Sequence, residues 1–268
     1  MEKHFKIRED LSMKYLGHTL YRIEATKDLP DHDVKKGDLG GWIEKEENLG
    51  GNAWIANEAK VYGNAEVFDN AKICDEAIVI DKAVVCGNAQ VYNAAIIREN
   101  ARIYGYARVF DTASVCGNAN VWGNVKAYGN TWIYGNVEVF DYAVIYGDAV
   151  IHGNAKIYDD AAVHGNAKVY DNAIIKSRAK VYGDAIVYGN AIALGDILRH
   201  ENDCKNITGE KYAITITPNY IKIGCEYHTK EEWWSFANRE ILEMFGEEGL
   251  KWWTKWKPAL KIICEEGE

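Results

Sequence analysis

Residues 51–74 read GNAWIA-NEAKVY-GNAEVF-DNAKIC, and the same six-residue period runs without insertion or deletion to GDAIVY-GNAIAL at residues 183–194. The 24 hexads of residues 51–194 carry Ala at position three in 21 cases and Ile or Val at position five in 22. Side chains alternate between the two faces of a strand, so positions three and five point the same way. The pattern predicts short strands that bury Ala and a branched residue, with corners at positions one and two.

This period indicates a parallel β-solenoid, because a hexapeptide β-helix repeats every six residues and no helix does. Three strands and three corners make one coil of 18 residues, so residues 51–194 predict eight coils. Stacked strands lie roughly 4.8 Å apart, which gives a prism about 38 Å long. Asn occupies position two in 13 hexads. We expect this Asn to supply the left-handed backbone conformation at the corners, which bulky and branched residues avoid.

The recurring V-Y-G-N-A motif resembles the hexapeptide repeat of left-handed β-helix proteins, best known among acyltransferases. The left-handed coiling is implied by this resemblance and not by the spacing. GHTLYRIEATKDL (17–29) and DVKKGDLGGWIEKEENL (33–49) are similar to a narrower group of bacterial and prophage proteins with YGNA repeats, described as polymer-forming or transferase-like. IKIGCEYHTKEEW (221–233) also looks like a tail found on phage-associated proteins. The resemblance implies a fold, but a fold alone defines no function.

Composition excludes several classes of function. The chain has 268 residues, a formal net charge of −9 and a pI near 5.4, which argues against nucleic acid as a partner. It has no 18-residue apolar run, so we expect no membrane span, and MEKHFKIRED shows no apolar signal region. Cys74, Cys86 and Cys116 occupy position six on three different faces, so they cannot form a disulfide ladder. Reduced thiols fit a cytoplasmic protein.

Three segments follow from these patterns: an N-terminal cap (1–50), the β-helix (51–195) and a C-terminal α+β unit (196–268). A solenoid ends in open strand edges, which associate unless they are covered. In the first segment we expect a strand pair over Tyr15–Glu24 and a turn at Gly40–Gly41, followed by Trp42 and Ile43. This segment is predicted to cover the first coil.

The C-terminal segment is predicted to hold a hairpin and two helices. Lys211–Thr217 and Tyr220–Tyr227 alternate around Pro218–Asn219, which indicates a β-hairpin. Thr229 and Glu232 form a capping box that opens a helix to about Met244, and a second helix is expected over Glu247–Lys257, before Pro258. This unit caps the solenoid, oligomerises or binds a partner. Five tryptophans could form an aromatic core or line a partner site: Trp233, Trp234, Trp252, Trp253 and Trp256.

Candidates for chemistry are few. His152 and His164 are the only histidines in the repeat; both stand at position six, point outward and lie on different faces. Acyltransferases of the resembled fold use a histidine near a subunit junction, but a general base needs a partner within hydrogen-bond reach, and the spacing fixes none. His200, Cys204, Cys225 and His228 have a loose spacing that could hold zinc. The Gly-Asn pairs are turn residues and not a phosphate loop, so no cofactor is expected.

The outward positions distinguish the faces, because residues 18 apart stack in a column. On what we call the first face, position four reads Lys60, Ile78, Ile96, Ser114, Trp132, Val150, Lys168, Ile186. On the second face it reads Trp54, Lys72, Gln90, Arg108, Lys126, Val144, Ala162, Lys180. A long exposed apolar surface usually marks an interface, although tyrosines could also stack as a ladder without a partner. The predicted interface, named here the apolar stripe, consists of Ile78, Ile80, Ile96, Trp132, Tyr134, Val150, Tyr170, Ile186 and Tyr188.

Three hypotheses of function remain open. The first is a non-catalytic solenoid scaffold, encoded by a phage or mobile element, that forms a homo-oligomer and binds a host or phage protein; the resemblance suggests a trimer. The second is a phage protein that sequesters a small molecule, such as a nucleotide signal, between subunits or at the caps. The third is an acyltransferase that uses an acyl-CoA donor. Ligand retention separates the second from the first, and acyl-CoA turnover separates the third.

Overall fold

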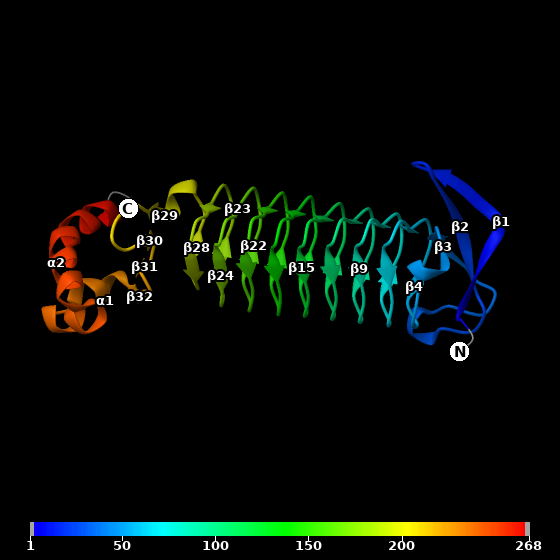
Figure 1. Ribbon diagram of the computed structural model, residues 1–268, viewed down its shortest axis with the longest axis horizontal. Helices are drawn as coiled ribbons and strands as arrows, with labels where there is room; N and C mark the ends of the chain where they lie inside the picture. The colour runs from blue at the N-terminus through cyan, green and yellow to red at the C-terminus, as the bar shows by residue number, and fades with distance from the viewer. Residues whose placement is uncertain (1–2, 266–268) are drawn as a thin grey trace.

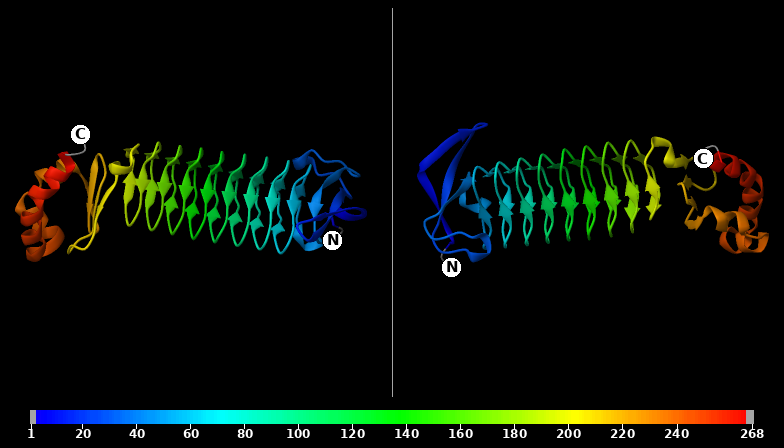
Figure 2. Two further views of the ribbon diagram at one scale, coloured as in Figure 1. Left: turned by 90° about the horizontal axis from the view of Figure 1, so that it is seen from above. Right: turned by 180° about the vertical axis from the view of Figure 1, so that it is seen from behind.

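The computed structural model of the chain describes residues 3–265 and shows a rod with a folded unit at each end (Figures 1 and 2). The prediction of a parallel β-solenoid is confirmed. Residues 18 apart pair in parallel register, as Lys60 with Ile78 and Ile96 with Ser114. Each hexad contributes one short strand, and the three strands of a coil enter three separate sheets.

The first face is an eleven-stranded sheet, of which eight strands belong to the repeat. These are β5 (Lys60–Val61), β8 (Ile78–Val79), β11 (Ile96–Ile97), β14 (Ser114–Val115), β17 (Trp132–Ile133), β20 (Val150–Ile151), β23 (Lys168–Val169) and β26 (Ile186–Val187).

The second face is a nine-stranded sheet. Its strands are β4 (Trp54–Ile55), β7 (Lys72–Ile73), β10 (Gln90–Val91), β13 (Arg108–Val109), β16 (Lys126–Ala127), β19 (Val144–Ile145), β22 (Ala162–Val163), β25 (Lys180–Val181) and β28 (Ile197–Leu198).

The third face is an eight-stranded sheet. Its strands are β6 (Glu66–Val67), β9 (Val84–Val85), β12 (Arg102–Ile103), β15 (Asn120–Val121), β18 (Glu138–Val139), β21 (Lys156–Ile157), β24 (Ile174–Lys176) and β27 (Ile192–Leu194). Strand β28 lies beyond the last hexad, so the solenoid begins a ninth turn after the eight predicted coils.

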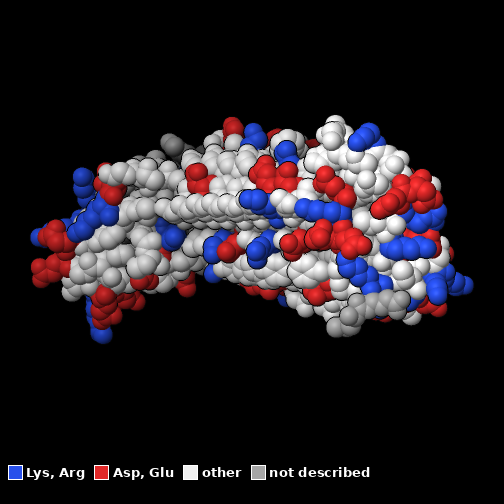
Figure 3. Space-filling view, turned by 45° about the vertical axis from the view of Figure 1, so that its right-hand side comes forward, with Lys and Arg blue, Asp and Glu red and all other residues white. Residues whose placement is uncertain are grey.

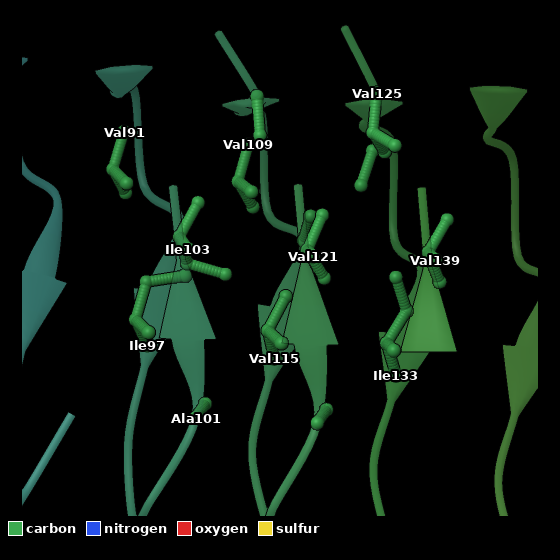
Figure 4. Close-up of a cluster of buried hydrophobic side chains, with 14 of the residues drawn as sticks. Val91, Ile97, Ala101, Ile103, Val109, Val115, Val121, Val125, Ile133 and Val139 are labelled. Atoms are coloured by element: carbon green, nitrogen blue, oxygen red, sulfur yellow. The ribbon is translucent and has the colours of Figure 1, made fainter. Parts of the chain in front are cut away.

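The core is the interior of the prism, where positions three and five from all three faces meet (Figure 4). Every position-five residue of the repeat is buried, including the two alanines, and the small position-three alanines let the faces approach closely. The coil of residues 123–140 departs from the usual Ala at position three and Ile or Val at position five. It has Val125, Thr131 and Val137 at position three and Ala127 at position five. Val125 and Ala127 exchange the usual order of small and large, which keeps the volume of that strand nearly constant.

The corners differ from the prediction, because the left-handed conformation falls on position one and not on the Asn at position two. Asp69 and Gly87, which are successive position-one residues of one corner, have φ of 59° and 67°. The Asp69 carboxylate accepts the Gly87 N–H at 3.1 Å, so Asp satisfies the backbone of the next coil. A Cβ on Gly117 would lie 2.6 Å from the Gly135 nitrogen, which is why glycine is needed there. The position-two asparagines instead form side-chain ladders, as Asn118 to Asn136 at 2.9 Å.

The N-terminal segment extends the first-face sheet past the first coil. Strand β1 (Phe5–Tyr15) pairs antiparallel with β2 (His18–Ala25), so the predicted strand pair is longer than Tyr15–Glu24. Strand β3 (Leu39–Ile43) then pairs in parallel with β5. The prediction of a turn at Gly40–Gly41 is wrong, because both glycines lie inside β3. A Cβ on Gly40 would lie 2.6 Å from the Ile55 carbonyl oxygen, so close packing requires the glycine.

Short 3₁₀ segments and side-chain hydrogen bonds complete this cap. The segments are η1 (Pro30–His32) and η2 (Glu46–Asn48). His4 Nε2 donates to the Ala53 carbonyl at 2.8 Å, and Asn48 Nδ2 donates to the Ala65 carbonyl at 2.8 Å. Both acceptors belong to the first coil, so the N-terminal segment occupies carbonyl groups that would otherwise be left at its edge.

The C-terminal segment folds as a four-stranded antiparallel sheet packed against helices. After η3 (Glu201–Asp203) come β29 (Lys205–Ile207), β30 (Ile214–Ile216), β31 (Tyr220–Ile223) and β32 (Glu226–Thr229). The hairpin around Pro218–Asn219 is confirmed. A second turn at Gly224–Cys225 divides the predicted strand Tyr220–Tyr227 into β31 and β32, because Gly224 adopts a positive φ of 58°.

The first helix begins where predicted, but it ends earlier, and the second helix begins before the predicted Glu247 and ends after the predicted Lys257. The capping box of Thr229 and Glu232 is confirmed and opens α1 (Lys230–Ser235), which stops long before Met244. Helix α2 (Asn238–Glu265) follows, with a break at Gly246, where φ is 69°. The prediction that the last helix ends before Pro258 is wrong. The turns beyond Pro258 bury Leu260 and Cys264 against the C-terminal core, and this packing outweighs the cost of an internal proline. Within residues 3–265, neither helix is long and apolar enough to cross a membrane.

Candidate functional site

The apolar stripe of the first face is a continuous surface in the folded chain. Its position-four residues lie side by side on neighbouring strands, from Ile78 on β8 through Trp132 on β17 to Ile186 on β26. The Trp132 side chain is 52% exposed, whereas the other members of the stripe are half-buried. Ser114 interrupts the row but is itself buried. The sheet therefore presents apolar atoms to solvent over most of its length.

Position six of the same face forms a stack of rings. His152 lies between Tyr134 and Tyr170, with ring centroids 5.0 and 4.9 Å away and nearly parallel planes, and Tyr188 continues the stack. Comparable stacks occur on the other faces. They run through Tyr92, Phe110, Tyr128, Tyr146, His164 and Tyr182 on the second face and through Tyr104, Trp122, Phe140 and Tyr158 on the third. Ring stacking is therefore a property of the fold, and the tyrosines alone do not single out the first face.

Position four separates the faces. On the third face half of this column is charged, and Glu138 there forms an ion pair with Lys156 at 2.8 Å; the uncharged half is Val84, Asn120, Ile174 and Ile192. The second face carries Lys72, Arg108, Lys126 and Lys180. On the first face the charged residues of the column are Lys60 near one end and Lys168, with apolar side chains and Ser114 between them. Figure 3 shows that on one side of the molecule charged side chains are dense over the N-terminal part and also gather at the C-terminal end.

The β1–β2 hairpin borders the N-terminal end of the stripe. The rings of Tyr15 and His18 contact Tyr62, with centroids 5.9 and 4.9 Å away, and Lys60 Nζ lies 5.1 Å from the centre of the Tyr15 ring. Leu16 at the hairpin tip is 77% exposed. No local pattern in the sequence indicates this placement, because the contact joins segments more than 40 residues apart. Leu16 therefore adds an exposed apolar group at the tip of the hairpin that contacts Tyr62.

The two candidate catalytic histidines are rungs of ring stacks. Burial and the nearby Lys180 lower the pKa of His164, which is the opposite of what a neighbouring carboxylate would do. His152 stacks between two tyrosines, and in residues 3–265 neither histidine has a side-chain hydrogen bond or an ion pair. The structure places both on different faces, as the spacing predicted.

The four candidate zinc ligands are not gathered into one site. Cys204 is buried, His200 and Cys225 are exposed, and His228 lies 3.3 Å from Glu226. In the part of the chain that the structure describes, no group of three or more His, Cys, Asp or Glu side chains could hold a metal ion. Burial raises the pKa of Cys204 to about 12, so this thiol is held in the protonated form.

Three of the five candidate partner-binding tryptophans are core residues, which corrects the prediction for them. Trp233, Trp252 and Trp253 are at most 8% exposed and pack between the helices and the four-stranded sheet. The Trp233 indole N–H donates to the Ile221 carbonyl at 2.7 Å. A partner cannot reach these rings without unfolding the unit. Trp234 and Trp256 are half-buried and stay predictions.

A hollow of about 830 Å³ lies where the solenoid meets the C-terminal sheet. It follows one corner through Asp141, Asp159 and Ser177 and ends at Tyr220. Next to it, Asp196 is fully buried at the position where Ala179 stands one coil earlier, since Lys180 pairs with Ile197. Its Oδ2 accepts from the Leu194 N–H at 3.2 Å and the Tyr227 hydroxyl at 3.4 Å. Burial raises the pKa of Asp196, and this carboxyl group joins the last coil to the C-terminal sheet.

Comparison with known proteins gives one short match. Residues 179–195 match the family model described as the YdcK beta solenoid repeat. The matched stretch contains β25, β26 and β27, the final strands of the hexad array. No curated protein matches the chain. The comparison thus supports a β-solenoid repeat and assigns no activity.

Proposed function

We propose that this protein is a non-catalytic β-solenoid scaffold that self-associates through the apolar stripe of the first face. The observation that carries the proposal is the row of apolar position-four residues on that face, with Trp132 half-exposed at its middle. The equivalent positions of the second face are largely charged or polar. Burying a half-exposed Trp and four aliphatic side chains stabilises an association without requiring any ion pair.

A second copy of the chain is the occupant that fits this surface best. Most of its exposed side chains are apolar, with Lys168 as the charged residue between Val150 and Ile186, so two copies can bury this surface against each other without matching a pattern of charges. One hexad spans up to about 20 Å and eight coils about 38 Å, which gives a face of roughly 750 Å². A stable interface uses about 800 Å² per partner. The face is therefore about the size of one such contact, and in a closed trimer it would be divided between the two neighbouring subunits.

A closed trimer is the assembly we propose, and the finer family assignment is part of the same proposal. The 18-residue register, with Ala and a branched residue facing inward in nearly every hexad, supports membership of the left-handed hexapeptide-repeat family. The six cysteines are all free, which supports a reducing compartment such as the cytoplasm. A phage or mobile-element origin rests on the sequence resemblance alone.

The test is a double substitution on the stripe with a matched control. Ile96→Lys with Trp132→Glu places a Lys and a Glu on the first face, and Gln90→Lys with Lys126→Glu places a Lys and a Glu at position four of the second face in the same coils, with a net charge lower by one. Both pairs stand at outward positions, so circular dichroism should show a folded solenoid in each. Light scattering should give the wild type and the control a mass near three times 30.2 kDa and the first-face variant a mass of 30.2 kDa. An equal mass for all three proteins would exclude this face as the interface.

A further inference from the structure

The ring stack of the third face lacks one rung. Successive position-six residues of this face are Phe68, Cys86, Tyr104, Trp122 and Phe140. From Tyr104 onward the rings stack coil on coil with planes within 5° of parallel. Cys86 carries no ring, so Phe68 and Tyr104 are separated by two coil rises, about 10 Å, with no side chain of ring size between them.

The same stack shows what fits a two-coil gap. Tyr104 and Phe140 are also two coils apart, and the indole of Trp122 lies between them at centroid distances of 5.5 and 4.6 Å. Because the solenoid repeats every 18 residues, the gap between Phe68 and Tyr104 has the same dimensions along the rod. It therefore has room for a planar group of up to indole size, in the stacking geometry that this face already uses.

A concave site coincides with the missing rung. A cavity of about 340 Å³ is lined by Glu66, Phe68, Val84, Cys86, Arg102, Tyr104 and Asn120. This volume is at the lower end of the roughly 300–1,000 Å³ that is usual for small-molecule sites. Figure 1 shows β9, the strand of Val84 and its neighbour Val85, with no other segment of the chain drawn over it.

The lining divides into an apolar slot and a polar margin. Val84 and Cys86 form the floor, and burial keeps the Cys86 thiol protonated by raising its pKa, so the floor is uncharged. Glu66 and Arg102 stand at position four in the coils on either side. Neither forms an ion pair in residues 3–265, so a carboxylate acceptor and a guanidinium donor are available to a ligand.

The other position-six cysteines do not make such a slot. Cys74 has Tyr92 on one side but Ala56 on the other. Cys116 is 7% exposed and lies next to Arg98 instead of a second ring. Among these three cysteines, Cys86 alone has an aromatic residue in both neighbouring coils.

We propose that the gap between Phe68 and Tyr104 binds a free planar heteroaromatic molecule of one or two fused rings, such as a nucleobase or an indole, as the missing rung of the third-face stack. The ring system stacks between the two side chains, and its polar edge meets Glu66 and Arg102. This site lies on a different face from the proposed interface, so it does not depend on self-association.

The experiment fills the slot with a side chain of the protein itself. Adenosine and indole serve as planar probes and cyclohexanol as a non-planar control, with binding followed by calorimetry or ligand-observed NMR. Cys86→Phe supplies the missing ring. It should weaken binding of both planar probes at least tenfold and raise the melting temperature, because it completes the stack. Cys74→Phe is the matched control, a new ring next to one neighbour only, and should leave binding unchanged.

Phe68→Ala provides a second route if Cys86→Phe fails to fold. It removes one wall of the slot and should weaken planar-probe binding by roughly five- to a hundredfold, as for loss of one stacking ring. The proposal is overturned if neither planar probe binds the wild type, if cyclohexanol binds as well as indole, or if Cys86→Phe and Phe68→Ala bind normally. If Cys86→Phe loses self-association while probe binding is absent, the slot holds an aromatic side chain of a second copy and the proposal is also wrong.

Discussion

Replacing Thr131 by Val should stabilise the solenoid, because Thr131 is the one position-three residue of the repeat with a hydroxyl group. Its side chain is fully buried, and Oγ1 has no hydrogen-bond partner in the described part of the chain. A buried hydroxyl without a partner costs about 1–3 kcal/mol. Valine has nearly the same shape and adds a buried methyl group, which contributes up to about 1 kcal/mol. The expected gain in unfolding free energy is therefore roughly 1–4 kcal/mol.

Thermal and urea unfolding, followed by far-UV circular dichroism, measure this gain. For a domain of this size, about 1 kcal/mol shifts the melting temperature by roughly 2–4 °C. Thr131→Ser keeps the hydroxyl, loses the methyl group and should destabilise. Thr112→Val is the surface control, since Thr112 is exposed and its hydroxyl donates to the Gly129 carbonyl at 3.1 Å. A Thr131→Val protein that is no more stable than the wild type would refute the reasoning, because the hydroxyl would then have to be satisfied.

Three further predictions test the core, the junction and the cap. Val121→Asp puts a charge into the interior of a central coil and should abolish soluble folded protein. Asn120→Asp lies on the outward side and should leave the stability almost unchanged. Equal melting temperatures for these two variants would reject the assignment of position five to the interior. Asp196 has a folded-state pKa raised above its unfolded value of about 3.9, so its contribution to stability is largest at low pH and falls as pH rises through the folded pKa. The melting temperature of Asp196→Asn minus that of the wild type should therefore increase from about pH 4 upward, and a pH-independent difference would contradict this. A chain that ends at residue 195 should keep its β-type circular dichroism but assemble end to end, because strand edges are exposed; a monodisperse fragment in light scattering would count against capping.

The repeat was predictable because every coil fills its interior with the same two kinds of side chain, Ala at position three and Ile or Val at position five. Only one strand register points both of these positions inward, because a shift by one residue would turn them to the solvent. The six-residue spacing therefore predicts the register of every strand. The prediction that Asn at position two adopts the left-handed conformation of the corners is wrong. Asn and Gly stand next to each other, and the sequence does not show which of them adopts the positive φ. The structure places the positive φ at position one, on residues such as Asp69 and Gly87. The backbone of the next coil comes close to this position, which favours glycine there.

The ends were less predictable because they depend on contacts between distant segments. Gly40 resembles a turn residue, and its place inside β3 is fixed by Ile23, Trp54 and Ile55, which no local pattern reveals. Pro258 normally ends a helix, but burial of Leu260 carries α2 past it. Of the candidate site, the apolar stripe could be read from columns of residues 18 apart. The order Phe68, Cys86, Tyr104 can also be read from a column of residues 18 apart. The cavity beside Cys86 could not be predicted, because its walls depend on how the neighbouring rings are placed.

The unbroken 18-residue register makes the rod a spacer whose length changes in fixed steps of about 4.8 Å, one for each coil. Removing residues 153–170 would join His152 directly to Asp171, again a position-six residue followed by a position-one residue. Tyr188 would then take the place of Tyr170 beside the His152 ring, so the stack would close without a gap. Removing a single hexad would instead move every later strand to the next face and turn the C-terminal unit about the rod axis. Whole coils therefore set the distance between the two end units, and single hexads set the direction in which one faces relative to the other.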